Sequence, residues 1–150
     1  MVNDKIVTVL MTTYESEPKT ISSSGEMVFN ILSDLTNLQK LASNPTFAEK
    51  AKDMRYDSDS CSFAVDGFGR IGFRIVERSP STKIVMASEN APVSFQVDVI
   101  IGHLSENEST LKLIMNAELP AMIKMMVGSK LQDGVNAIAE LLAATQNSKL

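Results

Sequence analysis

The sequence is poor in the residues that build disulfides and metal sites. Its 150 residues include one cysteine, Cys61, and one histidine, His103. A single cysteine excludes an intrachain disulfide framework. One histidine with one cysteine are too few ligands for an ordinary zinc site. We therefore expect no metal and no cofactor.

Long apolar runs and an excess of basic charge are missing as well. No apolar run reaches the roughly 18 residues that span a bilayer, so we expect no stable membrane insertion. The first residues show no basic leader and no small-residue cleavage site, which argues against a signal peptide and favours a cytoplasmic protein. The net charge of -4 argues against a nucleic-acid partner.

The residues that are present describe an ordinary globular chain. Hydrophobic residues make up 44% and charged residues 21% of the sequence, and the length suits one domain with one core. We expect a single domain over residues 11–146, preceded by an N-terminal extension over residues 1–10. Either Met1 or Met11 can be the start of translation.

The first third of the chain is predicted to hold one strand and two helices. Residues 14–21 are typical of an edge strand, where Pro18 is tolerated. Ser23 and Glu26 have the spacing of a capping box and predict the start of a helix. A good cap at position 44, followed by proline, predicts a second, short helix.

The hydrophobic period then changes twice. Between residues 53 and 120 apolar and polar residues alternate, which predicts six half-buried antiparallel strands. After residue 120 an apolar stripe at helical spacing predicts one amphipathic helix of about 25 residues. A sheet with one apolar face needs a cover, and only this helix is long enough. We expect an α+β fold in which a seven-stranded curved antiparallel sheet wraps around the C-terminal helix and encloses a cavity.

This order of elements resembles the helix-grip superfamily, which includes START lipid-transfer domains, the birch-pollen-allergen family and polyketide cyclase-like proteins. The resemblance covers residues 12–145. Within the superfamily, the chain is most similar to small uncharacterised bacterial members. It is carried by "YESEPKTISSSGEMVFNILSDLTNLQKL", "DGFGRIGFRIVERSPSTKIVMASE" and "PAMIKMMVGSKLQDGVNAIAELLA". It implies a deep apolar cavity between sheet and helix. The superfamily hosts lipid carriers, hormone receptors, cyclases and co-chaperones, and the fold does not choose among them.

One stretch, "VDGFGRIGF", contains the pattern GxGxxG at Gly67, Gly69 and Gly72. A dinucleotide site needs a helix directly after the last glycine, and here a strand pattern follows. A kinase glycine-rich loop would have valine at the position of Arg74. We interpret the stretch as a β-hairpin that turns at Asp66-Gly67.

Few residues qualify as catalytic. His103 ends a strand and is either a general base at the end of a cavity or a partly solvated residue at a strand–turn junction, and the absence of a positioned partner favours the second. Cys61 on an apolar strand face is predicted to be buried packing. The alternation places Arg70, Arg74 and Arg78 on the solvated outer face. We assign no catalytic residue.

The predicted function is therefore binding of a small hydrophobic or amphipathic ligand, lipid-like or polyketide-like, between the sheet and the C-terminal helix. The alternatives are a cyclase, dehydratase or hydrolase acting on a similar molecule, and a co-chaperone-like interaction module. The methionines of "MIKMM" are either core filling or an adaptable portal, and Arg55 is the candidate cation for a ligand carboxylate. The sequence leaves the ligand and the oligomeric state open. The expected lining residues are Phe63, Phe73, Ile75, Met86, Phe95, Val97, Val99, Met115, Met122, Met126 and Leu131.

Overall fold

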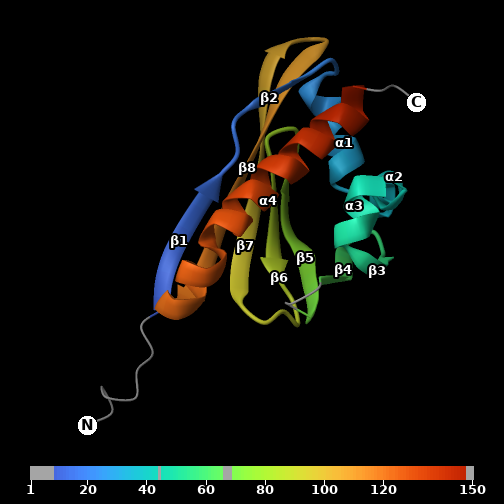
Figure 1. Cartoon of the computed structure of the whole chain (residues 1–150). Coiled ribbons are helices and arrows are strands. Elements are labelled where there is room, and N and C mark those ends of the chain that lie inside the picture. Colours follow the sequence, from blue (N-terminus) through green and yellow to red (C-terminus); the bar gives the residue numbers. More distant parts are fainter. Residues whose placement is uncertain (1–8, 44, 66–68, 148–150) are drawn as a thin grey trace.

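Antiparallel strands form one sheet, and a long helix lies across one of its faces (Figure 1). The computed structural model describes residues 9–43, 45–65 and 69–147. The strands follow one another across the sheet in the order β1-β8-β7-β6-β5-β4-β3, and β2 also pairs with β8. The strands are β1 (Val9–Glu15), β2 (Lys19–Ile21), β3 (Lys52–Tyr56), β4 (Ser60–Val65), β5 (Gly69–Ser79), β6 (Lys83–Ser88), β7 (Ser94–Ser105) and β8 (Glu108–Pro120).

The expected seven-stranded sheet is confirmed, with its first edge strand divided into β1 and β2, which both pair with β8. Between them, Ser16 exchanges backbone and side-chain hydrogen bonds of 2.9 Å with Leu113. Pro18 is exposed in this break, where its missing N–H leaves no ladder bond unmade. Strand β1 starts at Val9, two residues before the predicted domain boundary, which itself stays a prediction.

The short helices follow β2 and stand beside the sheet (Figure 1). The cap of the first helix is Ser24, whose side chain accepts a hydrogen bond of 3.1 Å from the backbone N–H of Met27, so the predicted capping box began one residue too early. Asp34 starts a new turn by accepting from the backbone and hydroxyl of Thr36. The predicted cap Asn44 lies outside the described residues. The elements are α1 (Gly25–Leu32), the 3-10 helix η2 (Leu35–Leu38), α2 (Gln39–Ala42) and α3 (Pro45–Lys50).

The long helix α4 (Ala121–Asn147) crosses the sheet diagonally and packs on β8, β1 and β2 (Figure 1). We call the covered face the inner face and the opposite one the outer face. The predicted apolar stripe included Ile138 and is only partly correct, because Ile138 is exposed while Ala139 and Ala143, which were not part of it, are buried. Small alanine side chains let the helix approach the sheet closely. The core residues are Tyr14, Ile21, Val28, Phe29, Leu35, Cys61, Ile75, Ile84, Val99, Ile101, Leu111, Leu113, Ala117, Leu119, Val135, Ala139, Leu142 and Ala143.

A β-bulge in β5 corrects one predicted side-chain direction. The pairing of β5 with β6 shifts by one residue between Ile75 and Glu77, so Arg78 stands opposite the inner-face residue Ile84. One extra residue reverses the alternation that follows it. The prediction that Arg78 lies on the outer face is therefore wrong. Its guanidinium reaches the 57–60 turn instead and forms an ion pair of 2.6 Å with Asp59.

Candidate functional site

The inner face is fully buried at one end, which we call the closed end, and only half-buried at the other, which we call the open end. Toward the closed end, where α1 packs on β6, β7 and β8, Ile84 is 1% exposed and Val99 is 3% exposed. Farther along the same strands, large apolar side chains on the same face remain only half-buried although they pack against the core. These half-buried side chains are Phe63, Phe73, Met86, Phe95 and Met115, and Val97 on the same face is half-buried as well.

Strand pairing gathers the predicted sheet residues on one face. Met86 stands beside Ile75 and Val97, and Val97 stands beside Met115, so these four form one row across the sheet. In the neighbouring row, Phe73 is paired with Cys61. The predicted sheet residues therefore do share the inner face, and Ile75 and Val99 are its fully buried members.

Two aromatic rings mark the open end. Phe63 in β4 and Phe73 in β5 meet edge to face, with ring centroids 6.4 Å apart and ring planes at 76°. This geometry is favourable for two aromatic rings. Both side chains are half-buried.

The predicted helix residues divide into two groups. Leu131 is half-buried and packs against the core. Met122 and Met126 are 73% and 66% exposed, and Met125 between them is 88% exposed. The interpretation of "MIKMM" as core filling is thus wrong for these three side chains. They form an exposed apolar group at the start of α4, which we call the methionine patch.

The inner face also holds three buried hydroxyls that the sequence did not reveal, those of Thr12, Tyr14 and Ser109. The hydroxyl groups of Thr12 and Tyr14, both on β1, are buried and have no hydrogen-bond partner among the described residues. The Tyr14 hydroxyl faces α4 at Gly128, where a Cβ atom would lie 3.4 Å from it. Polar residues occur on both faces of β1, so alternation gave no signal for these two.

Cys61 and His103 show no catalytic arrangement. Cys61 is buried on the inner face, and burial raises the pKa of its thiol to about 11, which keeps the sulfur protonated and unreactive at neutral pH. His103 is exposed near the end of β7, with its ring against Gly25 and its Nε2 atom 2.6 Å from the carbonyl oxygen of Ser81. Both residues therefore have the structural surroundings that the sequence favoured.

Gly69 and Gly72 lie within strand β5, which continues to Ser79 with no helix directly after the last glycine, so the nucleotide interpretation stays excluded. The predicted turn at Asp66-Gly67 lies outside the described residues. Gly72 has a different role, since a Cβ atom at this position would overlap the carbonyl oxygen of Glu89. The backbone N–H of Glu89 donates a hydrogen bond of 2.8 Å to the Gly72 carbonyl. Glycine is required here for close approach of two chain segments.

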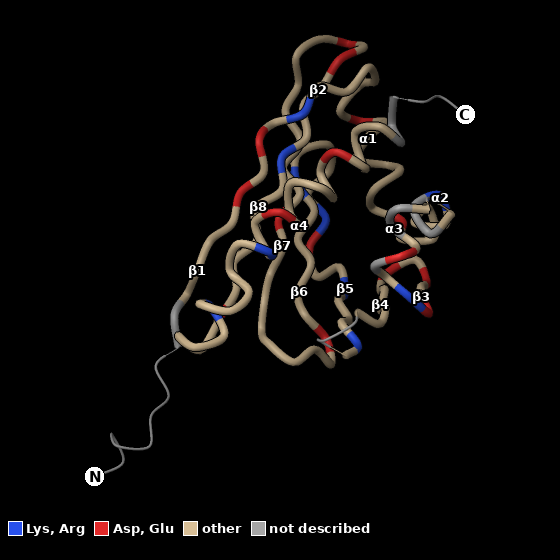
Figure 2. Tube along the Cα trace, in the orientation of Figure 1, with Lys and Arg blue, Asp and Glu red and all other residues tan. Residues whose placement is uncertain are grey.

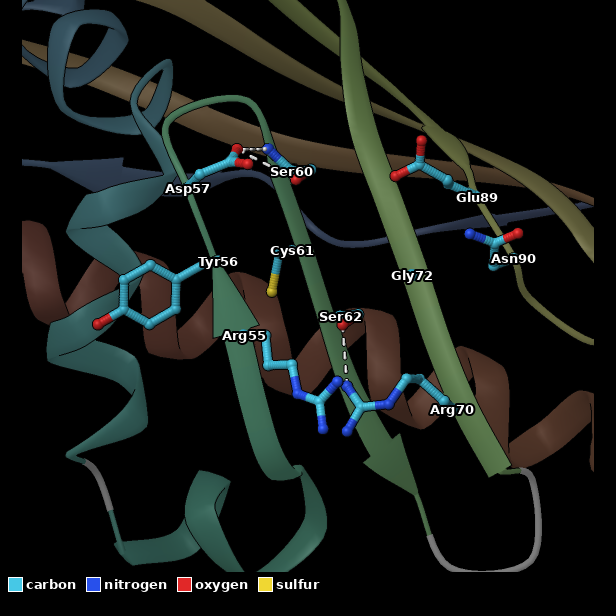
Figure 3. Close-up of a pocket in the computed structure, with 10 residues that line it drawn as sticks. All are labelled: Arg55, Tyr56, Asp57, Ser60, Cys61, Ser62, Arg70, Gly72, Glu89 and Asn90. Carbon is cyan, nitrogen blue, oxygen red and sulfur yellow. Dashed lines mark hydrogen bonds between the residues drawn. The ribbon is translucent and has the colours of Figure 1, made fainter.

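A pocket of about 290 Å³ lies beside Gly72 and opens on the outer face (Figure 3). The structure places Arg55 here, away from the other predicted ligand residues, because Arg55 pairs with the outer-face residue Ser62. The guanidinium groups of Arg55 and Arg70 point toward one another in front of β4 (Figure 3). The pocket is lined by Arg55, Tyr56, Asp57, Ser60, Cys61, Ser62, Arg70, Gly72, Glu89 and Asn90.

Within the described ranges, no three His, Cys, Asp or Glu side chains are placed to hold a metal ion together. No described helix combines the length and the apolar character needed to cross a bilayer.

The comparisons with known proteins bear on the fold. No protein-family profile matches the chain, and no curated protein matches it. Among solved structures, norcoclaurine synthase from Thalictrum flavum, in complex with dopamine and hydroxybenzaldehyde, is similar with a TM-score of 0.75 and 8% identity over 95% of this chain and 90% of that one. A Rhizobium loti protein is similar with a TM-score of 0.67 and 14% identity, over 91% of this chain and 98% of its own. A START superfamily protein from Mycobacterium smegmatis is similar with a TM-score of 0.54 and 16% identity, over 88% of this chain and 98% of its own. The chain therefore has the helix-grip fold that its sequence implied.

Proposed function

We propose that the protein binds a small apolar or amphipathic molecule between the open end of the inner face and α4. The observation that carries this proposal is the group of half-buried apolar side chains around Phe73, Met86 and Val97, next to fully buried neighbours on the same strands. A ligand that covers these side chains gains roughly 25 cal/mol for each Å² of apolar surface removed from water.

The methionine patch supports the proposal from the helix side. It stands at the start of α4, in the half of the helix that includes Leu131, which packs on the core. Methionine is unbranched and flexible, so it adapts to apolar ligands of different shape. The patch is suited to a portal through which an apolar molecule passes.

Tyr14 and Thr12 give the ligand a polar end. A buried hydroxyl without a partner is unfavourable, and a ligand hydroxyl, carbonyl or carboxyl group at this position would supply the missing hydrogen bond. We therefore expect an amphipathic ligand to bind more tightly than a pure hydrocarbon of the same size.

Binding is tested with purified protein by native mass spectrometry and by displacement of the dye N-phenyl-1-naphthylamine. We expect a saturable dye signal that long-chain alcohols and fatty acids displace. No co-purified molecule and no saturable dye binding would contradict the proposal.

A second candidate is a protein-interaction module, which the exposed methionine patch favours. The variant Met125→Lys separates the two functions, because Met125 is the most exposed of the three methionines. If the patch is only a portal, the variant keeps equilibrium dye binding and changes its rate. If the patch binds a protein, the unmodified chain binds a partner that the variant loses, and dye binding is absent from both.

An enzyme of the cyclase, dehydratase or hydrolase class would need an acid and a base inside the site. The half-buried side chains grouped around Phe73, Met86 and Val97 are apolar, and the polar groups that β1 adds to this face are the hydroxyls of Thr12 and Tyr14, so we favour binding over catalysis. The net charge of -4 and the single cysteine are the support for a cytoplasmic protein that acts without nucleic acid.

A further inference from the structure

Two arginines from different strands meet on the outer face (Figure 3). Arg55 in β3 and Arg70 in β5 both form ion pairs with the carboxylate of Asp53, and the Arg55 pair measures 3.0 Å. Arg70 also donates to Ser62 Oγ at 2.9 Å and to the Asp53 carbonyl oxygen at 3.1 Å. Both guanidinium groups are thus held over β4, at one end of the outer pocket.

The group formed by Arg55, Arg70 and Asp53 keeps a net positive charge and, among the described residues, unpaired N–H donors on Arg55. One carboxylate neutralises one of the two guanidinium groups. Arg55 uses a single N–H to reach Asp53, and its other N–H groups have no partner among residues 9–43, 45–65 and 69–147. Its side chain is 70% exposed. A guanidinium with one free edge matches a carboxylate or phosphate through two parallel hydrogen bonds.

The rest of the pocket leaves room for an anion beside the arginines. Ser60 and Ser62 carry small side chains on the outer face of β4, so the pocket continues along this strand beside the two arginines. The two carboxylates that line the pocket already have partners: Glu89 accepts from Arg74 at 3.0 Å, and Asp57 accepts 2.8 Å hydrogen bonds from two backbone N–H groups of its own turn. These hydrogen bonds lower the pKa of the Asp57 carboxyl. The arginine end is therefore the attractive end for a negative ligand.

A bulge in the backbone of β3 brings the charged side chains of this strand together. The pairing of β3 with β4 shifts between Lys52 and Arg55, and Asp53 within this bulge has a positive φ of 52°. The bulge brings Lys52 and Arg55, three residues apart, to the same face. In Figure 2, acidic and basic positions stand next to each other on β3. Exposed ion pairs contribute little to folding, so stability does not explain a strained, bulged strand that collects charge.

We propose that the outer face carries a second binding site, in which Arg55 and Arg70 bind the carboxylate or phosphate group of a small molecule. Asp53 occupies one edge of the paired guanidinium groups and orients them, and the ligand takes the free edge and the part of the pocket that runs along Ser62 and Ser60 of β4. The site lies on the face opposite the one that contacts α4, so it does not depend on the apolar ligand proposed above.

The site is tested by NMR titration of the labelled chain with inorganic phosphate and, separately, with succinate. We expect saturable shifts of the Arg55 and Arg70 side-chain N–H signals and of the Ser62 and Gly72 amides. Saturation by phosphate alone identifies a phosphate site and saturation by succinate alone a carboxylate site, and either result supports the proposal. Saturation by neither ligand overturns it.

Two variants distinguish specific binding at Arg55 from a general effect of positive charge on the outer face. Arg55→Gln is expected to weaken binding about tenfold, the usual effect of losing a charge-assisted hydrogen bond, and its exposed position leaves folding and dye binding unchanged. Lys83→Gln is the matched control, because Lys83 lies on the outer face and pairs with Glu77 at 3.7 Å. Equal weakening by both variants overturns the proposal.

Asp53→Asn tests the role of the shared carboxylate. The variant keeps the size of the side chain and removes the competing negative charge. We expect phosphate or succinate to bind severalfold more tightly, and weaker or unchanged binding contradicts the arrangement. Circular dichroism confirms that both β3 variants remain folded.

Discussion

The carbonyl oxygen of Glu89 lies directly over Gly72, in the place where any other residue would carry its Cβ atom. Two chain segments therefore touch at a position that only glycine can fill. The relationship explains one glycine of the pattern that resembles a nucleotide-binding loop.

Gly72→Ala should destabilise the fold by about 1 to 3 kcal/mol, because the backbone of Glu89 must move away from the new methyl group. Gly134→Ala is the matched control, since a Cβ at position 134 in α4 meets no atom within 4 Å. Alanine favours the helix, so this variant should be more stable by about 1 kcal/mol. Urea unfolding measures both changes. Equal effects of the same sign would show that Gly72 has no special contact.

Val97→Phe should block the inner site. Val97 is half-buried in the middle of the row that holds Met86 and Met115, so a larger ring occupies the space proposed for the ligand. We expect dye affinity to fall at least about tenfold, with a stability change below about 1.5 kcal/mol. Val76→Phe makes the same change on an exposed side chain and should leave dye binding intact. Loss of binding in both variants would mean that the dye reports something other than the inner site.

Tyr14→Phe removes a buried hydroxyl that has no partner among the described residues. The ligand-free protein should be more stable by about 1 kcal/mol, because an unpaired buried polar group is unfavourable. Affinity for a fatty alcohol should fall several-fold, while affinity for an alkane of equal length should not change. Denaturation and competition against the dye measure the two effects. Tyr56→Phe, in which the ring is half-buried in β3, serves as the control for losing a phenol.

Raising the pH above 9 should destabilise the protein through Cys61. Burial raises the pKa of the thiol from 9.0 to about 11, so the unfolded chain ionises first. The stabilisation is complete below pH 9 and is lost as the pH rises through 11, by at most about 3 kcal/mol. Urea unfolding between about pH 8 and pH 11 should show a steeper decline for the natural chain than for Cys61→Ala. Parallel declines would contradict the predicted pKa shift.

Much of the fold could be predicted from local patterns in the sequence. Alternation between residues 53 and 120 predicted the strands and which of their residues share the inner face, because side chains on a strand point to opposite faces in turn. The helical stripe after Pro120 predicted α4, and Cys61 was correctly assigned to buried packing. Each of these follows from short-range geometry that any stretch of chain obeys.

Pairing between strands decided the rest. The bulges beside Asp53 and Val76 are shifts of one strand against its neighbour, so counting along the chain could not place Arg78 on the inner face. The meeting of Arg55 with Arg70 requires β3, β4 and β5 to lie side by side. The sequence by itself determined the elements and the apolar face. Only the tertiary structure decided where that face stays open and which polar groups it leaves without partners, because both depend on how α4 and β1 pack against residues distant in the chain.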